Sequence, residues 1–422
     1  MKKIIYQLRA NYLAALAGLF LLASCNKDME QFAPIPTPVY PTGNGVAATL
    51  AANANYSFYN AMITRAGMTA TLNDLTKTYT LIATDNNGMK LFCNSLGVPA
   101  GSPDATYLGF INTTLPVASA AGIVNYNIIG QKFPFASFGT NFPNFPITSQ
   151  IILDPNQPFV RMPIFPDGGT PYSYVNTMPV IATDMAAANG VIHTTFSVVA
   201  PLPTTSAGAP ITLKNLIDGD ANLTYFKAAI ARADSGQVGI SGDGAYGLKF
   251  DSLMNYAVTN MTVLAPNNAA CQAIIFGFVY SQLLAQGVPA GTAFTIATNT
   301  ASSPAGFNAL PVASVRGIVA YHILASNNTG SYKPDTRTFA VNYPTTPGVF
   351  VKTLVNGSVA SHPGVLGTAT FTGPAVTSLK FSGAGTFPPG GTPYSQVANA
   401  TTWDKIAFNG VLHIIDAVLL PQ

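Results

Sequence analysis

The spacing of hydrophobic and polar residues passes from a helical pattern to strand patterns, and the chain shows this order twice. Each half opens with apolar residues three and four positions apart, which predicts one apolar face of a helix. These residues are Phe58, Tyr59, Met62, Ile63 and Ala66 in the first half, and Tyr225, Phe226, Ala229, Ile230 and Ala233 in the second. A β-rich run follows each helix, at residues 79–83 and 261–265. Each half closes with an apolar, β-branched strand, and this mixture predicts an α+β fold.

Short fragments recur in the same order in both halves. The sequence Asn-Gly-Val-Ile-His at 189–193 returns as Asn-Gly-Val-Leu-His at 409–413. Gly-Val-Pro-Ala-Gly occurs at 97–101 and again at 287–291. The distance between matching fragments grows along the chain, so the second copy carries insertions. A repeat of this length indicates two tandem globular domains and is too long for a solenoid unit.

The repeat predicts the domain boundaries. We expect a first domain at residues 50–203, a linker rich in Pro, Thr, Ser and Gly at 204–210, and a second domain at 211–422. Alternating positions within 338–355 and 369–381 predict additional strands and hairpins. Asp85 and Asn267 follow the first β-rich run of each half and are predicted N-caps of the next helix. The apolar segment 269–284 is predicted to be a buried helix, because Gln272, Ser281 and Gln282 interrupt it.

The N-terminus is predicted to be a lipoprotein signal peptide over residues 1–24. Positive residues precede an apolar run at 12–22 that is too short to span a bilayer. Leu-Ala-Ser-Cys at 22–25 resembles the bacterial lipobox, which predicts acylation, for example by palmitate, at Cys25. Residues 25–49 then form a Pro/Gly-rich tether. We expect a Gram-negative cell-envelope lipoprotein in the outer membrane, with exposure at the cell surface as an open alternative.

Charge and cysteine usage argue against several classes of function. Removing Lys2, Lys3 and Arg9 with the signal lowers Lys plus Arg from 19 to 16, equal to the 16 acidic residues. A neutral chain offers no electrostatic footprint for nucleic acid. Cys93 and Cys271 fit no metal-ligand spacing, so neither a metal nor a cofactor is predicted. The sequence also lacks the common hydrolase, metalloprotease and phosphate-loop motifs, so no enzymatic activity is predicted.

The order of these landmarks resembles the fasciclin-like domain family. In the second half, residues 262–268 resemble the family's Thr-x-Phe-Ala-Pro-Thr-Asn box, and Tyr321-His322 its central Tyr-His pair. Residues 409–421 resemble its closing Asn-Gly-x-Ile/Val-His-x-Ile-Asp box throughout. The first half departs from the pattern at Tyr126-Asn127, and Phe196 stands where the closing Asp belongs. The resemblance implies two tandem domains, each a β-wedge or sandwich packed with helices and carrying β-rich insertions, without catalysis.

The repeated closing motif supplies the candidate structural residues. Its histidines could act as ligands or bases, but their apolar neighbours favour buried rings that are satisfied by the backbone. Asp416 is expected to be a buried acceptor of loop backbone hydrogen bonds. The candidate structural residues are Asn189, Gly190, His193, Asn409, Gly410, His413 and Asp416.

Aromatic residues supply the candidate binding surface. A cluster in a Gly/Pro-rich stretch, which also contains Phe133, is the leading binding patch, although such a run could equally pack a hairpin. Its candidate binding residues are Phe135, Phe138, Phe142 and Phe145. The resemblance implies a receptor contact at Tyr321 and His322, whereas the apolar residues around them favour core packing.

These observations predict a non-enzymatic, lipid-anchored envelope protein for adhesion or extracellular interaction. Its expected partners are a membrane, through the N-terminal lipid, and an extracellular protein or glycan. The alternative is an accessory lipoprotein that binds glycans or peptides for an uptake or matrix system.

Overall fold

The computed structural model describes residues 38–421, apart from 140–145, 170, 207, 238–248, 329–330 and 387–390. Within it, Thr42–Gln422 forms one compact unit. Cys25, Phe142 and Phe145 lie outside the described residues, so the lipid anchor and half of the predicted Phe patch stay predictions.

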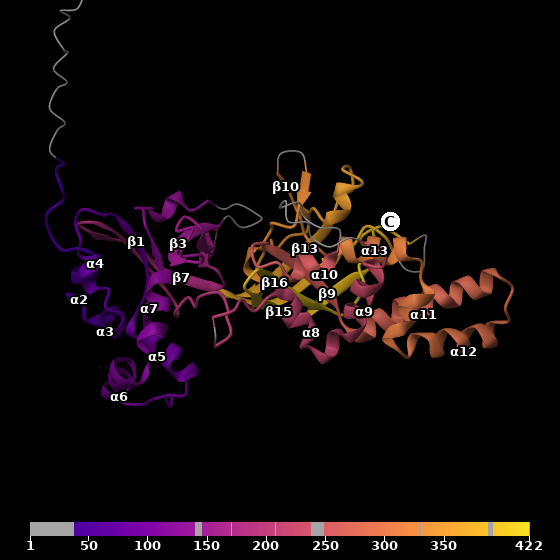
Figure 1. Ribbon diagram of the computed structural model, residues 1–422, viewed down its shortest axis with the longest axis horizontal. Helices are drawn as coiled ribbons and strands as arrows, with labels where there is room; N and C mark the ends of the chain where they lie inside the picture. Colours follow the sequence, from indigo (N-terminus) through magenta and orange to yellow (C-terminus); the bar gives the residue numbers. More distant parts are fainter. Residues whose placement is uncertain are drawn as a thin grey trace, which may run out of the picture. The chain divides into compact units, whose positions relative to one another are not determined.

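The first half contains six α-helices, eight strands and three short helical turns among the described residues (Figure 1). Its helices are α2 Val46–Ala51, α3 Ser57–Arg65, α4 Thr69–Leu72, α5 Asn86–Ser95, α6 Asp104–Gly109 and α7 Val117–Tyr126. Its strands are β1 Tyr79–Thr84, β2 Ile128–Ile129, β3 Ile147–Ile152, β4 Arg161–Ile164, β5 Pro166–Asp167, β6 Tyr174–Val175, β7 Met178–Ala187 and β8 Gly190–Thr195. The turns are η1 Ala54–Tyr56, η2 Phe110–Thr114 and η3 Phe135–Ser137.

The second half repeats this order with longer elements. Its helices are α8 Leu213–Asp218, α9 Thr224–Ala233, α10 Phe250–Asn255, α11 Asn268–Ala285, α12 Ala290–Ala301 and α13 Val312–Tyr321. Its strands are β9 Met261–Pro266, β10 Ser326–Asn328, β11 Ser331–Lys333, β12 Phe350–Val351, β13 Val365–Thr372, β14 Ala375–Ser382, β15 Val397–Ala407 and β16 Gly410–Ile415. The turns are η4 Ala221–Leu223, η5 Pro304–Ala309, η6 Ala340–Asn342 and η7 Leu354–Gly357.

A six-stranded mixed sheet lies at the centre of each half. The strand orders are β2-β1-β8-β7-β6-β5 and β12-β13-β14-β15-β16-β9. In both sheets the closing strand runs parallel to the opening strand, with Gly190 opposite Tyr79 and Gly410 opposite Met261. Helices pack on these sheets around apolar cores, so the chain has a mixed α and β fold, as predicted.

Local sequence signals placed several elements correctly. The two predicted opening helices are α3 and α9, and each buries its predicted apolar face. Asp85 caps α5 by accepting a hydrogen bond from the N–H of Gly88 at 2.8 Å. Asn267 caps α11 in the same way, through the N–H of Ala270 at 2.9 Å. These signals are local, because the capping oxygen and the N–H it satisfies are three residues apart.

Two predicted segments differ from the structure. Helix α2 begins at Val46, so residues 46–49 are helical, although we assigned them to the tether. Val46, Ala47 and Leu50 are buried in the first core, and this burial holds the segment in a helix. Residues 338–355 contain short helical turns and only the two-residue strand β12, whereas the hairpin predicted at 369–381 is present as β13 and β14.

Candidate functional site

The two repeated histidines are buried and fully engaged by the backbone. Nδ1 of His413 accepts a hydrogen bond from the N–H of Asp404 at 3.3 Å, so its proton is on Nε2. Nε2 then donates to the carbonyl of Thr338 at 3.0 Å. His193 makes the matching bonds to Asp184 and Phe133. Burial lowers the pKa of His413 to about 4 and also lowers the pKa of His193, which keeps both rings neutral.

The Asn and Gly of the same motif join each closing strand to its neighbours. The Asn409 side chain accepts from the N–H of Leu213 at 2.8 Å and donates to the carbonyl of Met254 at 2.9 Å. A Cβ on Gly410 would lie 2.3 Å from the carbonyl oxygen of Met261, closer than any side chain can come. Asn189 and Gly190 make the corresponding contacts in the first half. The geometry therefore assigns the motif a structural role.

Asp416 differs from its prediction as a buried acceptor of loop backbone. Its side chain is exposed and accepts from the backbone N–H of Asn399 at 2.7 Å and from that residue's side-chain amide at 3.0 Å. Asn399 lies on β15 and not in a loop. The carboxylate therefore ties the end of β16 to its neighbouring strand at the surface.

Tyr321 and His322 were candidate binding residues, and the structure corrects this assignment. Both side chains are fully buried. The Tyr321 hydroxyl donates to the carbonyl of Gly364 at 2.6 Å and accepts from the N–H of Ala384 at 2.9 Å. His322 donates from Nδ1 to the Ile318 carbonyl, and its Nε2 accepts a hydrogen bond from the backbone N–H of Leu419. Burial lowers the pKa of His322 to about 4, and neither side chain can reach a partner directly.

The predicted Phe patch is also largely internal where the structure describes it. Phe138 is 4% exposed and packs edge-on against His193, with ring centroids 5.5 Å apart. Phe135 is half-buried and packs on both of these rings. These residues cover the first sheet because the segment folds back over it, which corrects the prediction of an exposed binding patch at Phe138.

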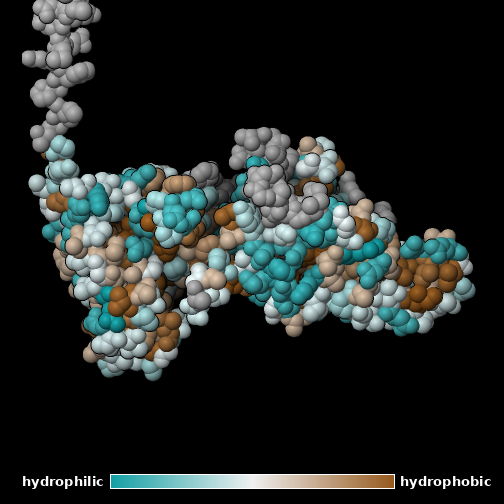
Figure 2. Space-filling view, in the orientation of Figure 1, coloured by the Kyte–Doolittle hydropathy of each residue, from teal (hydrophilic) through white to brown (hydrophobic). Residues whose placement is uncertain are grey.

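A different aromatic cluster is exposed, on the hairpin formed by α11 and α12. The rings of Phe276 and Tyr280 stack with centroids 5.5 Å apart, and Phe294 meets Phe276 edge-on at 5.3 Å. Phe294 is 56% exposed, and Leu284 and Ile296 on the same hairpin are each 41% exposed. The two helices run side by side away from the second sheet, and an apolar patch covers part of the hairpin surface that faces the viewer (Figures 1 and 2).

This hairpin corrects the prediction of a buried helix at 269–284. Among the described residues, α11 is the single unbent helix with the length and composition of a membrane span, yet only 33% of it is buried. The bent pair 104–114 and 117–126 passes the same test if it is taken as one element. No signal in the sequence indicated this exposure, because residues 267–315 carry no charge and an uncharged apolar helix is typical of a buried one.

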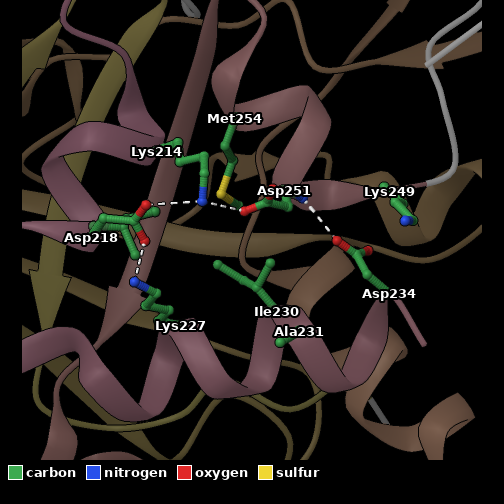
Figure 3. A pocket seen from close by; sticks show the side chains of 10 residues that line it. Lys214, Asp218, Lys227, Ile230, Ala231, Asp234, Lys249, Asp251 and Met254 are labelled. Carbon is green, nitrogen blue, oxygen red and sulfur yellow. Dashed lines mark hydrogen bonds and ion pairs between the residues drawn. The ribbon is translucent and has the colours of Figure 1, made fainter. Parts of the chain in front are cut away.

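A pocket of about 260 Å³ lies among α8, α9 and α10 (Figure 3). Lys214 bridges Asp218 at 2.9 Å and Asp251 at 2.6 Å, while Lys227 pairs with Asp218 at 2.9 Å. Asp234 accepts the backbone N–H groups at the start of α10. These charges compensate one another, so the cluster holds α10 against its neighbours and leaves these carboxylates little capacity for a ligand.

A buried arginine joins the two halves of the compact unit. Arg337 is 1% exposed; its Nε donates to the side chain of Asn260 at 2.7 Å, and its Nη2 donates to the carbonyl of Phe408 at 2.8 Å. Its guanidinium lies 4.9 Å from the ring centre of Phe165 in the first half. Burial lowers its pKa to about 10, and no ion pair to a described carboxylate offsets that burial.

Over the described residues, no group of three or more His, Cys, Asp or Glu side chains is placed to hold a metal ion. Burial also raises the pKa of the Cys93 thiol to about 11, which disfavours the thiolate that binds metals.

Comparison with known proteins gives similarity in structure but none in sequence. No family profile and no curated protein sequence matches the chain. Among solved structures, it is similar to a FAS1 domain pair from the insect cell adhesion molecule fasciclin I. That similarity has 14% sequence identity and a TM-score of 0.29, and it covers 86% of this chain and 95% of that one.

Proposed function

We propose that this protein is a non-enzymatic, lipid-anchored envelope protein that mediates adhesion or extracellular interaction through two fasciclin-like domains. The observation that carries the proposal is the exposed aromatic cluster of the α11–α12 hairpin. Rigid aromatic side chains give large contact area at low entropic cost, and they dominate the energy of many interfaces. Phe294, which packs against Phe276 and Tyr280 and is 56% exposed, presents such a ring to a partner.

The state of the histidines supports a non-enzymatic role. Each of the four in the sequence accepts a hydrogen bond from a backbone N–H. A general base needs a free nitrogen lone pair within reach of the substrate proton. In this chain that lone pair is occupied in every imidazole, and three of the four rings are fully buried. The imidazoles therefore stabilise the fold by binding backbone groups.

Bead attachment tests the proposal. Beads coated with the unlipidated chain from Asn26 onward would be applied to cells and to extracellular matrix, in parallel with a double variant of the hairpin, Phe294→Ser with Ile296→Ser. Both residues are exposed, so the variant is expected to fold normally and to lose most of the attachment. Phe159→Ser is the matched control, because Phe159 is 75% exposed but lies in the first half. Equal attachment by the hairpin variant and the unmodified chain would refute the proposed function.

A further inference from the structure

A cleft of about 890 Å³ lies where the two halves of the compact unit meet. One wall is the hairpin of β3 and β4, with the residues that connect these strands, in the first half. The other wall is the segment 256–260, which leads from α10 into β9 in the second half. Sites for small molecules in proteins usually measure about 300–1,000 Å³, so this cleft has room for one.

Apolar side chains form most of both walls. Ile152 in the first half and Val258 in the second half are exposed, whereas Met162 and Phe408 are buried. The lining therefore extends from exposed apolar residues at the surface to buried ones below it. Such a lining can take up the apolar part of a ligand.

A buried positive charge lies in the same cleft. Arg337 is among the lining residues, and the two hydrogen bonds of its guanidinium go to neutral oxygens, those of the Asn260 side chain and the Phe408 carbonyl. Its third nitrogen, Nη1, is buried and has no hydrogen-bond partner among the described residues. Burying a cation without an anion is costly, and an anionic ligand in the cleft would offset that cost.

The other charged residues of the lining also favour an anion. Arg161 donates from Nη1 to the carbonyl and side-chain oxygens of Gln150, which are neutral. Asp154 is the one carboxylate among the described lining residues, and it accepts the backbone N–H of Asn156. Two arginines and one aspartate give the described lining a net charge of +1.

Asn260 provides a further donor beside the guanidinium. Its Oδ1 accepts from Nε of Arg337 at 2.7 Å, which leaves the amide Nδ2 as a donor. That nitrogen makes no hydrogen bond to a described residue. An amide and a guanidinium that are joined in this way form a pair of donors suited to a carboxylate.

We infer that the cleft between the two halves binds a small amphipathic acid. The carboxylate of the ligand binds at Arg337 and Asn260, and its apolar body packs on residues such as Ile152 and Val258. The cleft shares no lining residue with the α11–α12 hairpin. This ligand site is therefore additional to the proposed function.

Isothermal titration calorimetry tests the inference. The unlipidated chain from Asn26 onward would be titrated with decanoate below its micelle concentration, and separately with decylammonium and with acetate. We expect one decanoate to bind per chain. Decylammonium carries the opposite charge and acetate lacks the apolar body, so each should bind at least about tenfold more weakly. Failure of decanoate to bind, or equal binding of decanoate and decylammonium, would overturn the inference.

A substitution on the exposed wall locates the site. Val258→Asp adds a negative charge beside the ligand and should weaken decanoate binding by at least about tenfold. Val359→Asp is the matched control in the second half and should bind like the unmodified chain. Val258 and Val359 are 66% and 48% exposed, and Val359 is not part of the lining. Unchanged binding by Val258→Asp would place the ligand elsewhere and contradict the inference.

Arg337→Gln tests the role of the buried charge. If the variant is folded by circular dichroism, it should lose the preference for decanoate over decylammonium. A folded variant that keeps this preference would overturn the inference, and Val258→Asp decides the question if Arg337→Gln does not fold. If sedimentation showed dimers that Val258→Asp disperses, the cleft would be a contact between two copies, which also overturns the inference.

Discussion

The backbone N–H of Asp404 donates to Nδ1 of His413 at 3.3 Å, and Asp184 makes the same bond to His193 at 3.2 Å. Both aspartates have positive φ, 54° and 59°, at irregular points of β15 and β7. Each carboxylate then accepts a backbone N–H from a segment crossing the sheet. Both halves therefore share one arrangement. An aspartate at an irregular point of the strand binds the buried imidazole through its N–H, and its carboxylate binds the segment that crosses the sheet.

His413→Ala is expected to destabilise the second half. The change leaves the Asp404 N–H and the Thr338 carbonyl without partners in a buried site. Each unsatisfied group costs about 1–3 kcal/mol. Urea unfolding of the unlipidated chain measures the loss, and Thr298→Ala on the exposed face of α12 is the control. A His413→Ala protein as stable as the control would show that solvent or relaxation satisfies these groups.

Asp404→Asn is expected to make the protein more stable above pH 7. Burial raises the pKa of Asp404 from 3.8 to about 7, although the Ala340 N–H opposes this shift. A raised carboxyl pKa favours the folded state below the unfolded pKa of about 4, and that contribution is lost as pH rises through the folded value. Asparagine keeps the acceptor oxygen without a charge. Melting temperatures across this range should separate with rising pH, and parallel curves would contradict the expectation.

Acid should destabilise the fold through its buried histidines. Burial lowers the pKa of both His322 and His413 from 6.5 to about 4. Depressed values stabilise the folded state above pH 6.5, and this contribution is lost as pH falls toward 4. The number of protons taken up on unfolding, obtained from the slope of stability against pH, should fall in His413→Gln. An unchanged slope in a folded variant would show that His413 does not contribute.

Gly410→Ala and Gly317→Ala should have opposite effects. The new methyl group at 410 would meet the Met261 carbonyl at 2.3 Å and the Leu213 side chain at 2.5 Å. Such overpacking typically costs about 1–3 kcal/mol. Nothing lies within 4 Å of a Cβ at Gly317 in helix α13, where alanine should stabilise by about 0.5–1 kcal/mol. Thermal unfolding compares the two, and a tolerated Gly410→Ala would mean that β9 and β16 can separate.

Arg337→Lys should destabilise the second half and weaken its contact with the first. A lysine cannot donate to Asn260 and Phe408 together, and it stacks less well on Phe165. Losing one hydrogen bond to a charged group costs about 1.5–3 kcal/mol. Calorimetry should show a lower first transition, with Lys227→Arg on the exposed face of α9 as the control. An unchanged profile would show that other contacts, such as the hydrogen bond from Asn342 to Asp167, join the halves without the guanidinium.

The sequence by itself determined the repeated order of elements, the opening helices and the caps at Asp85 and Asn267. It did so because these features depend on residues within a few positions of one another, and because each signal occurs twice. The Asn-Gly-x-x-His motif was also recognisable as structural from its apolar neighbours. Its partners, such as Leu213 and Met254, lie far away in the chain and could not be named.

Only the tertiary structure decided which apolar surfaces are covered. Phe138 was predicted to lie in an exposed binding patch and Phe294 was not singled out, yet the first is 4% exposed and the second 56%. A hydrophobic pattern shows which side of an element avoids water, but burial depends on whether a distant segment packs against that side. The chain folds back over Phe138 and brings it to His193. No described segment packs over Phe294 on the α11–α12 hairpin, and its ring stays exposed.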